Sequence, residues 1–398
     1  MPEDSFGEKI RLALQNLERA TVDVIYDRRK DLPARIYGCF LKGLSWIFCG
    51  IVKFRYFLYK NRIFRDSPLG CLVIVVGNLT VGGTGKTPVV EKFARELTAK
   101  GRKVAILSRG YKSKSDGLFK KLWRWITNGE LPKPKVVSDG KNILLNSEFA
   151  GDEPFMLARN LPGVVVVVDK NRVRAGNFAI KEFGVDTLIL DDGFQYLPLR
   201  GHMQLLLVDK TNPFGNKSLL PRGILREPVS HLKRASYIFL TKSDGRRDEE
   251  LENFIRQYNT GAEFIECAHK SKHLVEFHSM KQEPIEFLKG KKIAYFCAIA
   301  SPSSFEKFLV DAGVEIVYFE HFLDHHRFLK SELDDFFKDA VRAGAEYVLT
   351  TEKDAVRIDL DYGNALPFYY TRLEIEILSG TGGFDSAVER ICFKRNVE

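Results

Sequence analysis

Short apolar runs recur through the middle of the chain, and longer stretches with helical spacing of apolar residues separate them. The runs lie at residues 71–76, 103–107, 164–168, 187–190, 204–208 and 236–241. Their aliphatic and β-branched residues are nearly continuous, which is typical of strands buried on both faces of a parallel sheet. The pattern therefore predicts an α/β fold, in which helices cover both faces of a parallel sheet.

This rhythm is interrupted twice. Residues 112–150 form a long basic stretch without apolar periodicity, and we expect an irregular insertion there. The pattern is lost again after residue 262, and a shorter series follows, with strands expected at 292–297, 315–319 and 346–350 and helices at 303–312 and 331–343. The predicted organisation is a sheet domain at residues 66–262, a linker at 263–290 and a smaller α/β domain at 291–398.

Residues 1–65 are predicted to form N-terminal helices, one of which is unusually apolar. From Ile36 to Val52 the only charged residue is Lys42, and a basic segment with several aromatic residues follows. A membrane-spanning helix needs about 20 apolar residues, so this run is marginal for crossing. Its aromatic residues and basic flank suit a helix in the membrane interface on the cytoplasmic side. The alternative is a core helix that packs against the domain behind it.

Composition places the chain among ordinary globular proteins, with 44% hydrophobic and 28% charged residues in a length of 398. The formal net charge of +9 indicates an anionic partner, whether nucleic acid, a membrane surface or a phosphorylated substrate. The six cysteines are scattered without Cys-x2-Cys spacing, which argues against a disulfide framework and against a zinc site. The mixed polar start of the chain is unlike a secretory signal.

The most specific motif follows the first apolar run. Residues 80–88 read Thr-Val-Gly-Gly-Thr-Gly-Lys-Thr-Pro, which matches the phosphate-binding loop Gly-x4-Gly-Lys-[Ser/Thr] except at its first position. The glycines let backbone N–H groups face phosphate oxygens, Lys86 reaches the β- and γ-phosphates, and Thr87 offers a hydroxyl to Mg²⁺. A glycine-rich turn without this function is the alternative. The predicted nucleotide contacts are Thr80, Val81, Gly82, Gly83, Thr84, Gly85, Lys86 and Thr87.

Acidic residues follow the predicted strands at their carboxyl ends, where parallel α/β sheets bind ligands. Asp191 and Asp192 end the run 187–190, an arrangement that delivers a carboxylate to the Mg²⁺ of a phosphate loop. Asp152 stands at a junction between a loop and a helix. In both cases the alternative is a helix cap, in which the carboxylate only satisfies backbone N–H groups.

Two further clusters lie in the second predicted domain. Asp324-His325-His326 follows the predicted strand 315–319, and Thr351-Glu-Lys-Asp354 ends the strand that starts at Glu346. Both are candidates for facing a ligand, and a solvated loop or a purely structural turn is the alternative for each.

Residues 241–244, Thr-Lys-Ser-Asp, match in outline the loop with which GTPases read guanine. A match of this length is weak, and ordinary loop chemistry is the alternative. It keeps a second class of function open: a phosphate-loop switch, either a GTPase or a partition-type ATPase, that moves or assembles another protein. Partition-type ATPases carry a signature lysine where this chain has Val81.

Together the motifs resemble those of the tetraacyldisaccharide 4'-kinase (lipid A 4'-kinase) family, from about residue 33 to residue 358. They are residues 77–88, Ser108-Arg-Gly-Tyr111, Gly151-Asp-Glu-Pro154, Asp191-Asp-Gly-Phe-Gln195, residues 220–228, Asp324-His-His326 and Thr351-Glu-Lys-Asp354. The resemblance implies ATP-dependent phosphorylation of the 4'-hydroxyl of tetraacyldisaccharide 1-phosphate, a lipid A precursor in lipopolysaccharide biosynthesis. It implies a P-loop NTPase-type domain, a second smaller α/β domain, a site in the cleft between them, and a membrane-associated N-terminal helix at the cytoplasmic face of the inner membrane.

By position, the resemblance also implies roles for single residues. Lys86 and Thr87 correspond to the phosphate and Mg²⁺ ligands, and Asp191 and Asp192 to the acids of the metal site. Three more residues fall near the nucleotide or the metal: Gln195 as a nucleotide contact, Arg226, and Glu227 as a metal ligand beside Thr87 and Asp192.

The resemblance makes Asp152 the catalytic carboxylate and His325 its partner, and the chemistry agrees. A sugar hydroxyl is a poor nucleophile at neutral pH, so a carboxylate should accept its proton during attack. His325, from the other domain, would orient Asp152 when the cleft closes. The expected ligands are ATP, Mg²⁺ and an acylated glucosamine disaccharide lipid at a membrane surface. We expect a monomer without a nucleic-acid partner.

Overall fold

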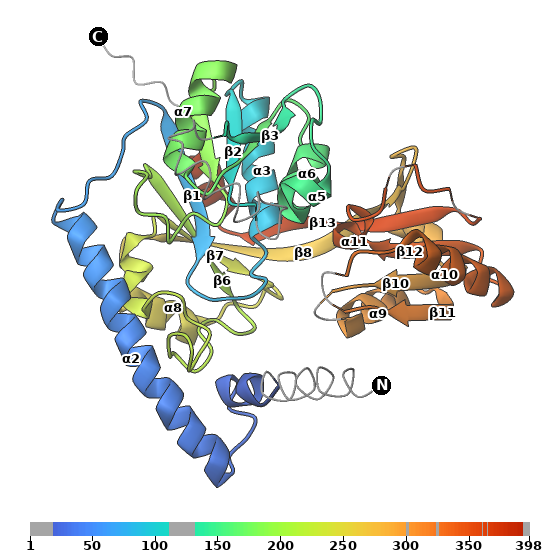
Figure 1. Cartoon of the computed structure of the whole chain (residues 1–398), viewed down its shortest axis with the longest axis horizontal. Coiled ribbons are helices and arrows are strands. Elements are labelled where there is room, and N and C mark those ends of the chain that lie inside the picture. The colour runs from blue at the N-terminus through green and yellow to red at the C-terminus, as the bar shows by residue number, and fades with distance from the viewer. Residues whose placement is uncertain are drawn as a thin grey trace, which may run out of the picture. The chain divides into compact units, whose positions relative to one another are not determined.

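The computed structural model describes residues 19–110, 132–299, 302–323, 326–359, 361–363 and 365–392 (Figure 1). The chain forms two compact units. Unit 1 comprises the described residues of Met1–Lys86, Leu190–Ala268 and Ile377–Glu398, and unit 2 comprises those of Thr87–Ile189 and His269–Glu376. Each unit takes residues from distant parts of the sequence, and the domain limits expected at residues 66–262, 263–290 and 291–398 stay predictions.

Unit 1 is built on parallel strands. Their order is the first part of β8 (Glu263–Glu276), then β7 (Tyr237–Thr241), β6 (Met203–Asp209) and β1 (Leu72–Asn78). Every residue of β7 is buried, as a near-continuous apolar run predicts. The other elements of this unit include η1 (Val229–Arg234), α8 (Glu249–Arg256) and α12 (Thr381–Cys392). Its core contains Phe194, Leu206, Phe214, Leu232, Ile238 and Ile255.

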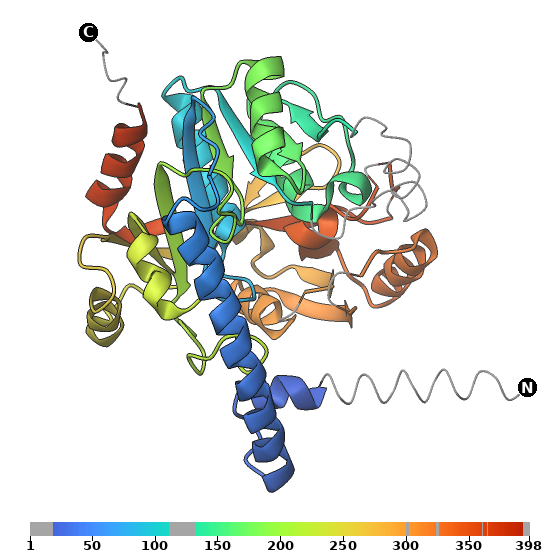
Figure 2. The ribbon, with the colours of Figure 1, turned by 60° about the vertical axis from the view of Figure 1, so that its left-hand side comes forward.

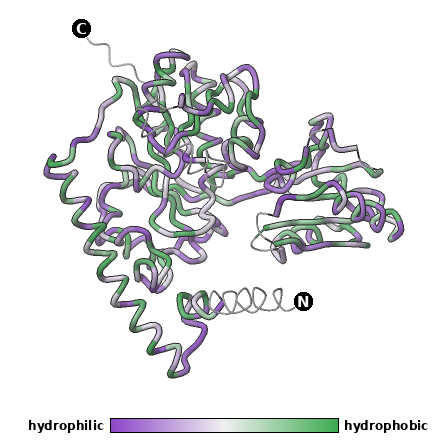
Figure 3. The backbone as a smooth tube through the Cα atoms, viewed as in Figure 1, coloured by the Kyte–Doolittle hydropathy of each residue, from purple (hydrophilic) through white to green (hydrophobic). Residues whose placement is uncertain are grey.

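Helix α2 (Leu32–Lys60) occupies the position of the expected apolar helix. Its buried residues are Ala34, Gly38, Leu41 and Ser45. The Ser45 hydroxyl donates a 2.8 Å hydrogen bond to the carbonyl oxygen of Leu219, which attaches this face of α2 to a distant segment of the same unit. By length and composition alone, α2 could cross a membrane. Figure 2 shows it as one straight helix, and Figure 3 shows apolar residues recurring along it.

The first part of unit 2 forms the expected alternation of strands and helices. Strands β2 (Val104–Ser108) and β4 (Val165–Val168) are parallel, whereas β3 (Lys135–Asp139) pairs antiparallel with β4. The remaining elements are α3 (Lys86–Ala99), α5 (Ser147–Ala150), α6 (Asp152–Asn160), α7 (Arg172–Phe183) and β5 (Thr187–Leu190).

The insertion expected to be irregular at residues 112–150 is ordered in its described part. It contains β3 and α5. The apolar pattern of β3 is too weak to predict a strand, and β3 forms because its backbone groups hydrogen-bond to those of β4. Residues 111–131, which include Tyr111, lie outside the described residues.

The second part of unit 2 confirms the smaller βα pattern. Its parallel strands follow the order β11 (Glu315–His321), β10 (Lys292–Cys297), β12 (Tyr347–Thr351) and β13 (Phe368–Ser379). The helices are α9 (Pro302–Asp311), α10 (Lys330–Arg342) and the short α11 (Glu352–Ala355). Residues 263–290, expected as a linker, contain β8, β9 (Gln282–Pro284) and η2 (Ile285–Leu288), since β8 continues as a strand and pairs with β9.

Candidate active site

The phosphate loop joins β1 to α3. Gly82 and Gly85 have φ angles of 108° and 78°, which residues with a Cβ rarely adopt, so the loop requires glycine at both positions. The Thr241 hydroxyl, at the end of β7, donates a 2.9 Å hydrogen bond to the carbonyl oxygen of Thr84. The loop conformation is therefore supported both by its own glycines and by a neighbouring strand.

Residues 220–228 are fixed against the start of this loop by backbone hydrogen bonds. The N–H of Val81 donates to the carbonyl of Ile224, and the N–H of Arg226 donates to the carbonyl of Leu79, both at 2.7 Å. These two bonds place the Arg226 side chain beside the phosphate loop, which explains why a motif so distant in sequence belongs to the same site.

Two cations and a carboxylate meet at the loop. Arg226 donates to both oxygens of Asp192 at 2.9 Å, and the Lys86 Nζ lies 3.5 Å from Asp192 Oδ1. Lys86 also donates to Asn78 Oδ1 at 3.3 Å, and the Gln195 amide donates to the Asn78 carbonyl at 2.8 Å. Burial favours the neutral acid, but the hydrogen bonds from Arg226 and the charge of Lys86 outweigh it and hold the pKa of Asp192 well below its usual range.

Three buried polar atoms at the loop have no hydrogen-bond partner among the described residues. They are Thr84 Oγ1, Gln195 Oε1 and Arg226 Nε. Buried polar groups are normally paired, so these atoms indicate where a polar ligand would complete the hydrogen bonding. A lysine and an arginine beside glycine-rich backbone match an anionic phosphate ligand.

The other predicted Mg²⁺ residues are buried near the ends of elements. Asp191 follows β5 and is 2% exposed, and Thr87 lies in the first turn of α3. In the part of the chain that the structure describes, no group of three or more His, Cys, Asp or Glu side chains could hold a metal ion. The metal roles of Thr87 and Asp192 stay predictions.

Glu227 is engaged in a buried ion pair. Its Oε2 lies 2.8 Å from His231 Nδ1 and 2.7 Å from the Arg234 guanidinium, and the His231 ring packs against Tyr56 of α2 at 4.6 Å between centroids. This set of contacts ties η1 to α2 and fits a structural role. The role of Glu227 as a metal ligand stays a prediction.

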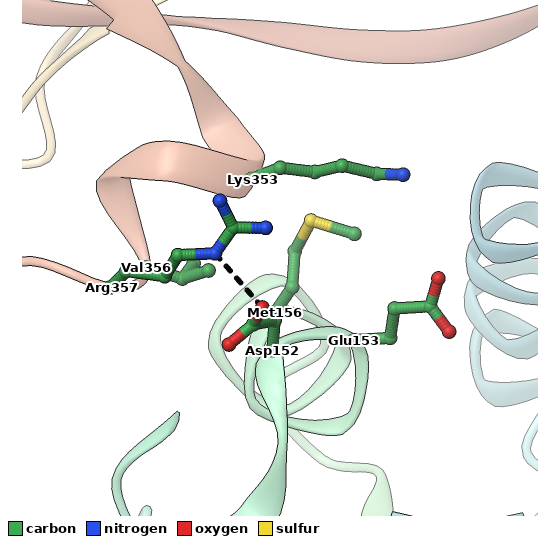
Figure 4. Close-up of a pocket in the computed structure, with 6 residues that line it drawn as sticks. All are labelled: Asp152, Glu153, Met156, Lys353, Val356 and Arg357. Carbon is green, nitrogen blue, oxygen red and sulfur yellow. Dashed lines mark hydrogen bonds and ion pairs between the residues drawn. The ribbon is translucent and has the colours of Figure 1, made fainter. Parts of the chain in front are cut away.

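In unit 2, Asp152 begins α6 directly after Gly151. Arg357 Nε donates to Asp152 Oδ2 at 2.9 Å, and Arg327 donates to Oδ1 at 3.4 Å. The two arginines differ in environment, because the Arg357 side chain is 1% exposed and that of Arg327 is 43% exposed. Figure 4 shows the Arg357 guanidinium directed at Asp152 in a pocket lined by Asp152, Glu153, Met156, Lys353, Val356 and Arg357.

The sequence did not single out Arg357. The Asp354 Oδ1 accepts from Arg357 Nη1 at 2.9 Å, and Asp354 Oδ2 accepts from the Thr351 hydroxyl at 2.7 Å and from the Ala298 N–H at 3.1 Å. The turn at residues 351–354 therefore fixes the Arg357 side chain, and Arg357 binds Asp152. The available signal was the spacing of Asp354 and Arg357, which places both on one face of a helical turn.

Asp324 and His325 lie outside the described residues, so the pairing of His325 with Asp152 stays a prediction. The next residue, His326, lies 2.8 Å from Glu332 through Nε2 and stacks on Phe322 at 5.0 Å between centroids. His326 therefore contributes to the packing of the turn before α10.

The family model of tetraacyldisaccharide-1-P 4'-kinase matches residues 37–392. The chain is 37% identical over 351 residues to the tetraacyldisaccharide 4'-kinase of Desulfotalea psychrophila, which covers 88% of this chain and 95% of that protein. It is 34% identical over 359 residues to the tetraacyldisaccharide 4'-kinase of Halothermothrix orenii, covering 87% of this chain and 90% of that protein.

The likeness extends to a solved structure. LpxK from Aquifex aeolicus, in complex with ATP, superposes with a TM-score of 0.69 at 29% sequence identity, over 88% of this chain and 98% of that chain. The α/β fold of this chain is therefore similar to that of the solved structure, as its sequence is.

Proposed function

The chain belongs to the tetraacyldisaccharide-1-P 4'-kinase family, and on this premise we propose how its residues carry out the reaction. The enzyme catalyses ATP-dependent phosphorylation of the 4'-hydroxyl of tetraacyldisaccharide 1-phosphate in lipid A biosynthesis. The observation that carries this function is the family match over residues 37–392. The roles of single residues are our proposals.

On the donor side, Lys86 and Arg226 neutralise the triphosphate. Phosphoryl transfer asks a protein mainly for positioning and charge neutralisation, and the backbone N–H groups of residues 82–87 supply the rest of the phosphate cradle. In the structure Asp192 holds both cations beside the loop. A phosphate oxygen would replace the Asp192 carboxylate as the partner of these two cations. The buried atoms without partners, Thr84 Oγ1, Gln195 Oε1 and Arg226 Nε, would then gain hydrogen bonds to the ligand.

Mg²⁺ is the metal we propose, with the Thr87 hydroxyl and the Asp192 carboxylate as its protein ligands. The lowered pKa keeps Asp192 anionic at neutral pH, and Mg²⁺ takes oxygen ligands, usually one or two carboxylates together with phosphates and water. Held there, the ion would supply positive charge beside the phosphate oxygens. Asp191 is a further proposed member of this site.

On the acceptor side, Asp152 is the proposed general base. It accepts the proton of the 4'-hydroxyl as that oxygen attacks the γ-phosphorus, so that a new O–P bond forms, the bond to the β-phosphate oxygen breaks, and ADP leaves. The position of its carboxylate in a pocket supports this role (Figure 4). His325, by the resemblance, is its proposed partner.

A nucleotide switch is the competing function: the loop 241–244 would suit a GTPase, and the Gly-Gly-Thr-Gly-Lys-Thr core is similar to that of partition-type ATPases, whose signature lysine is replaced here by Val81. In the structure Lys242 Nζ lies 2.6 Å from Asp209 Oδ2, and the Asp244 side chain is 64% exposed. We expect ATP to be used in preference to GTP, with the preference unchanged in Asp244→Ala. Competition between the two nucleotides in acceptor-dependent turnover tests this. A GTP preference that Asp244→Ala abolishes would favour the switch.

We propose that α2 brings the enzyme to the cytoplasmic face of the inner membrane, where its lipid substrate lies. The support is an apolar face that is exposed to solvent, with Trp46 at 70% and Ile36 at 64% exposure. A basic segment follows, which would favour an anionic membrane surface. A monomer without a nucleic-acid partner also stays a prediction.

The reaction is tested with full-length protein, γ-labelled ATP, Mg²⁺ and vesicles that contain tetraacyldisaccharide 1-phosphate. We expect label on the 4' position of the lipid, and only when the acceptor is present. ATP hydrolysis without a labelled lipid would contradict the kinase assignment and support the switch.

A further inference from the structure

One short segment, residues 351–357, contacts both ends of helix α6. At the start of α6, Arg357 binds Asp152 at 2.9 Å. At its end, the Asn160 side chain donates to Glu352 Oε1 at 2.6 Å, and both of these residues are 8% exposed. The helix that carries the proposed base is therefore fixed at both termini by the same turn within unit 2.

We propose that Arg357 is a positioning residue for phosphoryl transfer, which fixes one carboxylate oxygen of Asp152 and so orients the other toward the acceptor hydroxyl. This inference rests on the proposed role of Asp152 as the base. The planar guanidinium suits the task, because separate N–H groups of one rigid fork bind Asp152 through Nε and Asp354 through Nη1. A lysine ammonium is a single point charge and cannot reproduce that fork.

The guanidinium is itself held from inside the protein. Asp354 is 0% exposed and accepts hydrogen bonds from Thr351, Ala298 and Arg357. Because the carboxylate that anchors Arg357 is buried, packing sets the position of the guanidinium.

Arg327 is the contrasting case. It contacts the other oxygen of Asp152 at 3.4 Å from a side chain that is 43% exposed, so water screens the interaction. Arg357 therefore determines where Asp152 points, and a displacement of about 1 Å in a reacting group costs about 10²-fold in rate.

The test is Arg357→Lys in the full-length enzyme, with kcat, the KM values for ATP and lipid acceptor, and thermal unfolding measured together. We expect kcat to fall about 10²-fold while the KM for ATP changes less than about twofold. The matched control is Arg102→Lys, another largely buried arginine of unit 2 that pairs with a carboxylate, Asp186, outside the contacts of α6, and it should keep kcat. A folded Arg357→Lys enzyme with kcat within about threefold of wild type would overturn the proposal.

A double-mutant cycle with Asp152→Asn separates the two ideas. If Arg357 acts through Asp152, the double variant should be no slower than Asp152→Asn alone, whereas additive losses in log kcat would refute the positioning role. Wild-type kcat in Asp152→Asn would refute the base itself. If Arg357→Lys does not fold, the charge-balanced pair Arg357→Gln with Asp354→Asn takes its place, and normal kcat in that pair overturns the proposal.

Discussion

At the scale of single residues, the phosphate loop keeps two cations side by side by means of one carboxylate. Lys86 and Arg226 would repel each other, but both contact Asp192, which is ionised at neutral pH because its pKa is lowered. The same carboxylate that organises the cations is the proposed ligand of Mg²⁺. When Mg²⁺ and the nucleotide bind, the two cations would pair with phosphate oxygens and Asp192 would pair with Mg²⁺. Each of the three charged groups would therefore keep a partner.

The first prediction concerns Lys86→Ala. We expect a loss of about 10²–10³-fold in kcat, the usual cost of removing one preorganised group that stabilises charge in a transition state. The unfolding midpoint should change little, because the contacts of Lys86 are polar and the side chain retains 16% exposure. The matched control is Lys92→Ala on the same helix, where the lysine pairs with Glu96 at 2.9 Å. Near wild-type turnover in Lys86→Ala would contradict the phosphate-loop assignment.

At the scale of elements, α2 has features of both alternatives that its sequence left open, a core helix and a helix in the membrane interface. Leu41 is buried in a small apolar cluster with Val24 and Ala34, and Ser45 is buried against Leu219, as expected for a core helix, while other sides of α2 expose large apolar residues to solvent. Deleting the helix would therefore remove buried packing together with any membrane contact. Substitutions confined to the exposed side separate the two effects.

The second prediction is that Trp46→Ser with Ile47→Ser weakens co-sedimentation with anionic vesicles and raises the KM for the lipid acceptor, with the KM for ATP unchanged. Each large apolar side chain contributes about 1.5–3 kcal/mol when buried, so the loss should exceed tenfold in partition. The control is Val310→Ser with Val341→Ser, which are 59% and 49% exposed on α9 and α10. Unchanged partition in the α2 variant would place the membrane contact elsewhere.

At the scale of the whole molecule, a buried polar cluster joins distant parts of unit 2. Asn160 of α6 donates to Glu91 of α3 at 3.2 Å and to Glu352 of α11, and Arg372 of β13 pairs with Glu91. Burial raises the pKa of Glu352 to about 7; the hydrogen bond from Asn160 opposes the rise, and the charge of Glu91 adds to it.

The third prediction follows from that pKa. The folded state binds a proton at Glu352 more tightly than the unfolded state, whose ordinary value is 4.5. This stabilisation is complete below about pH 4.5 and is lost as the pH rises to about 7, a change of about 3 kcal/mol. Denaturant midpoints between pH 5 and pH 8 should therefore fall with pH in the wild type, and fall less in Glu352→Gln. Exposed Glu346→Gln should behave as wild type, and an unaltered slope in Glu352→Gln would refute the assignment.

Features that reside in contiguous residues could be read from the sequence alone. Local spacing predicts the phosphate loop with its glycines and Lys86, the acids after residue 190, and the buried parallel strands. It does so because backbone conformation and local chemistry are properties of neighbouring residues. The same holds for the apolar length of α2, and the family resemblance rested on motifs of this kind.

Features that depend on partners distant in sequence were decided only by the tertiary structure. Arg357 and Asp152 are separated by 205 positions, and local spacing links Arg357 to Asp354 but not to Asp152. Glu227 matches a site motif, yet His231 and Arg234 bind it as a buried ion pair. Strands β3 and β8 lack a plain apolar run and form because neighbouring strands complete their hydrogen bonds. Local sequence determines which groups are available, whereas burial and long-range pairing determine which of them meet.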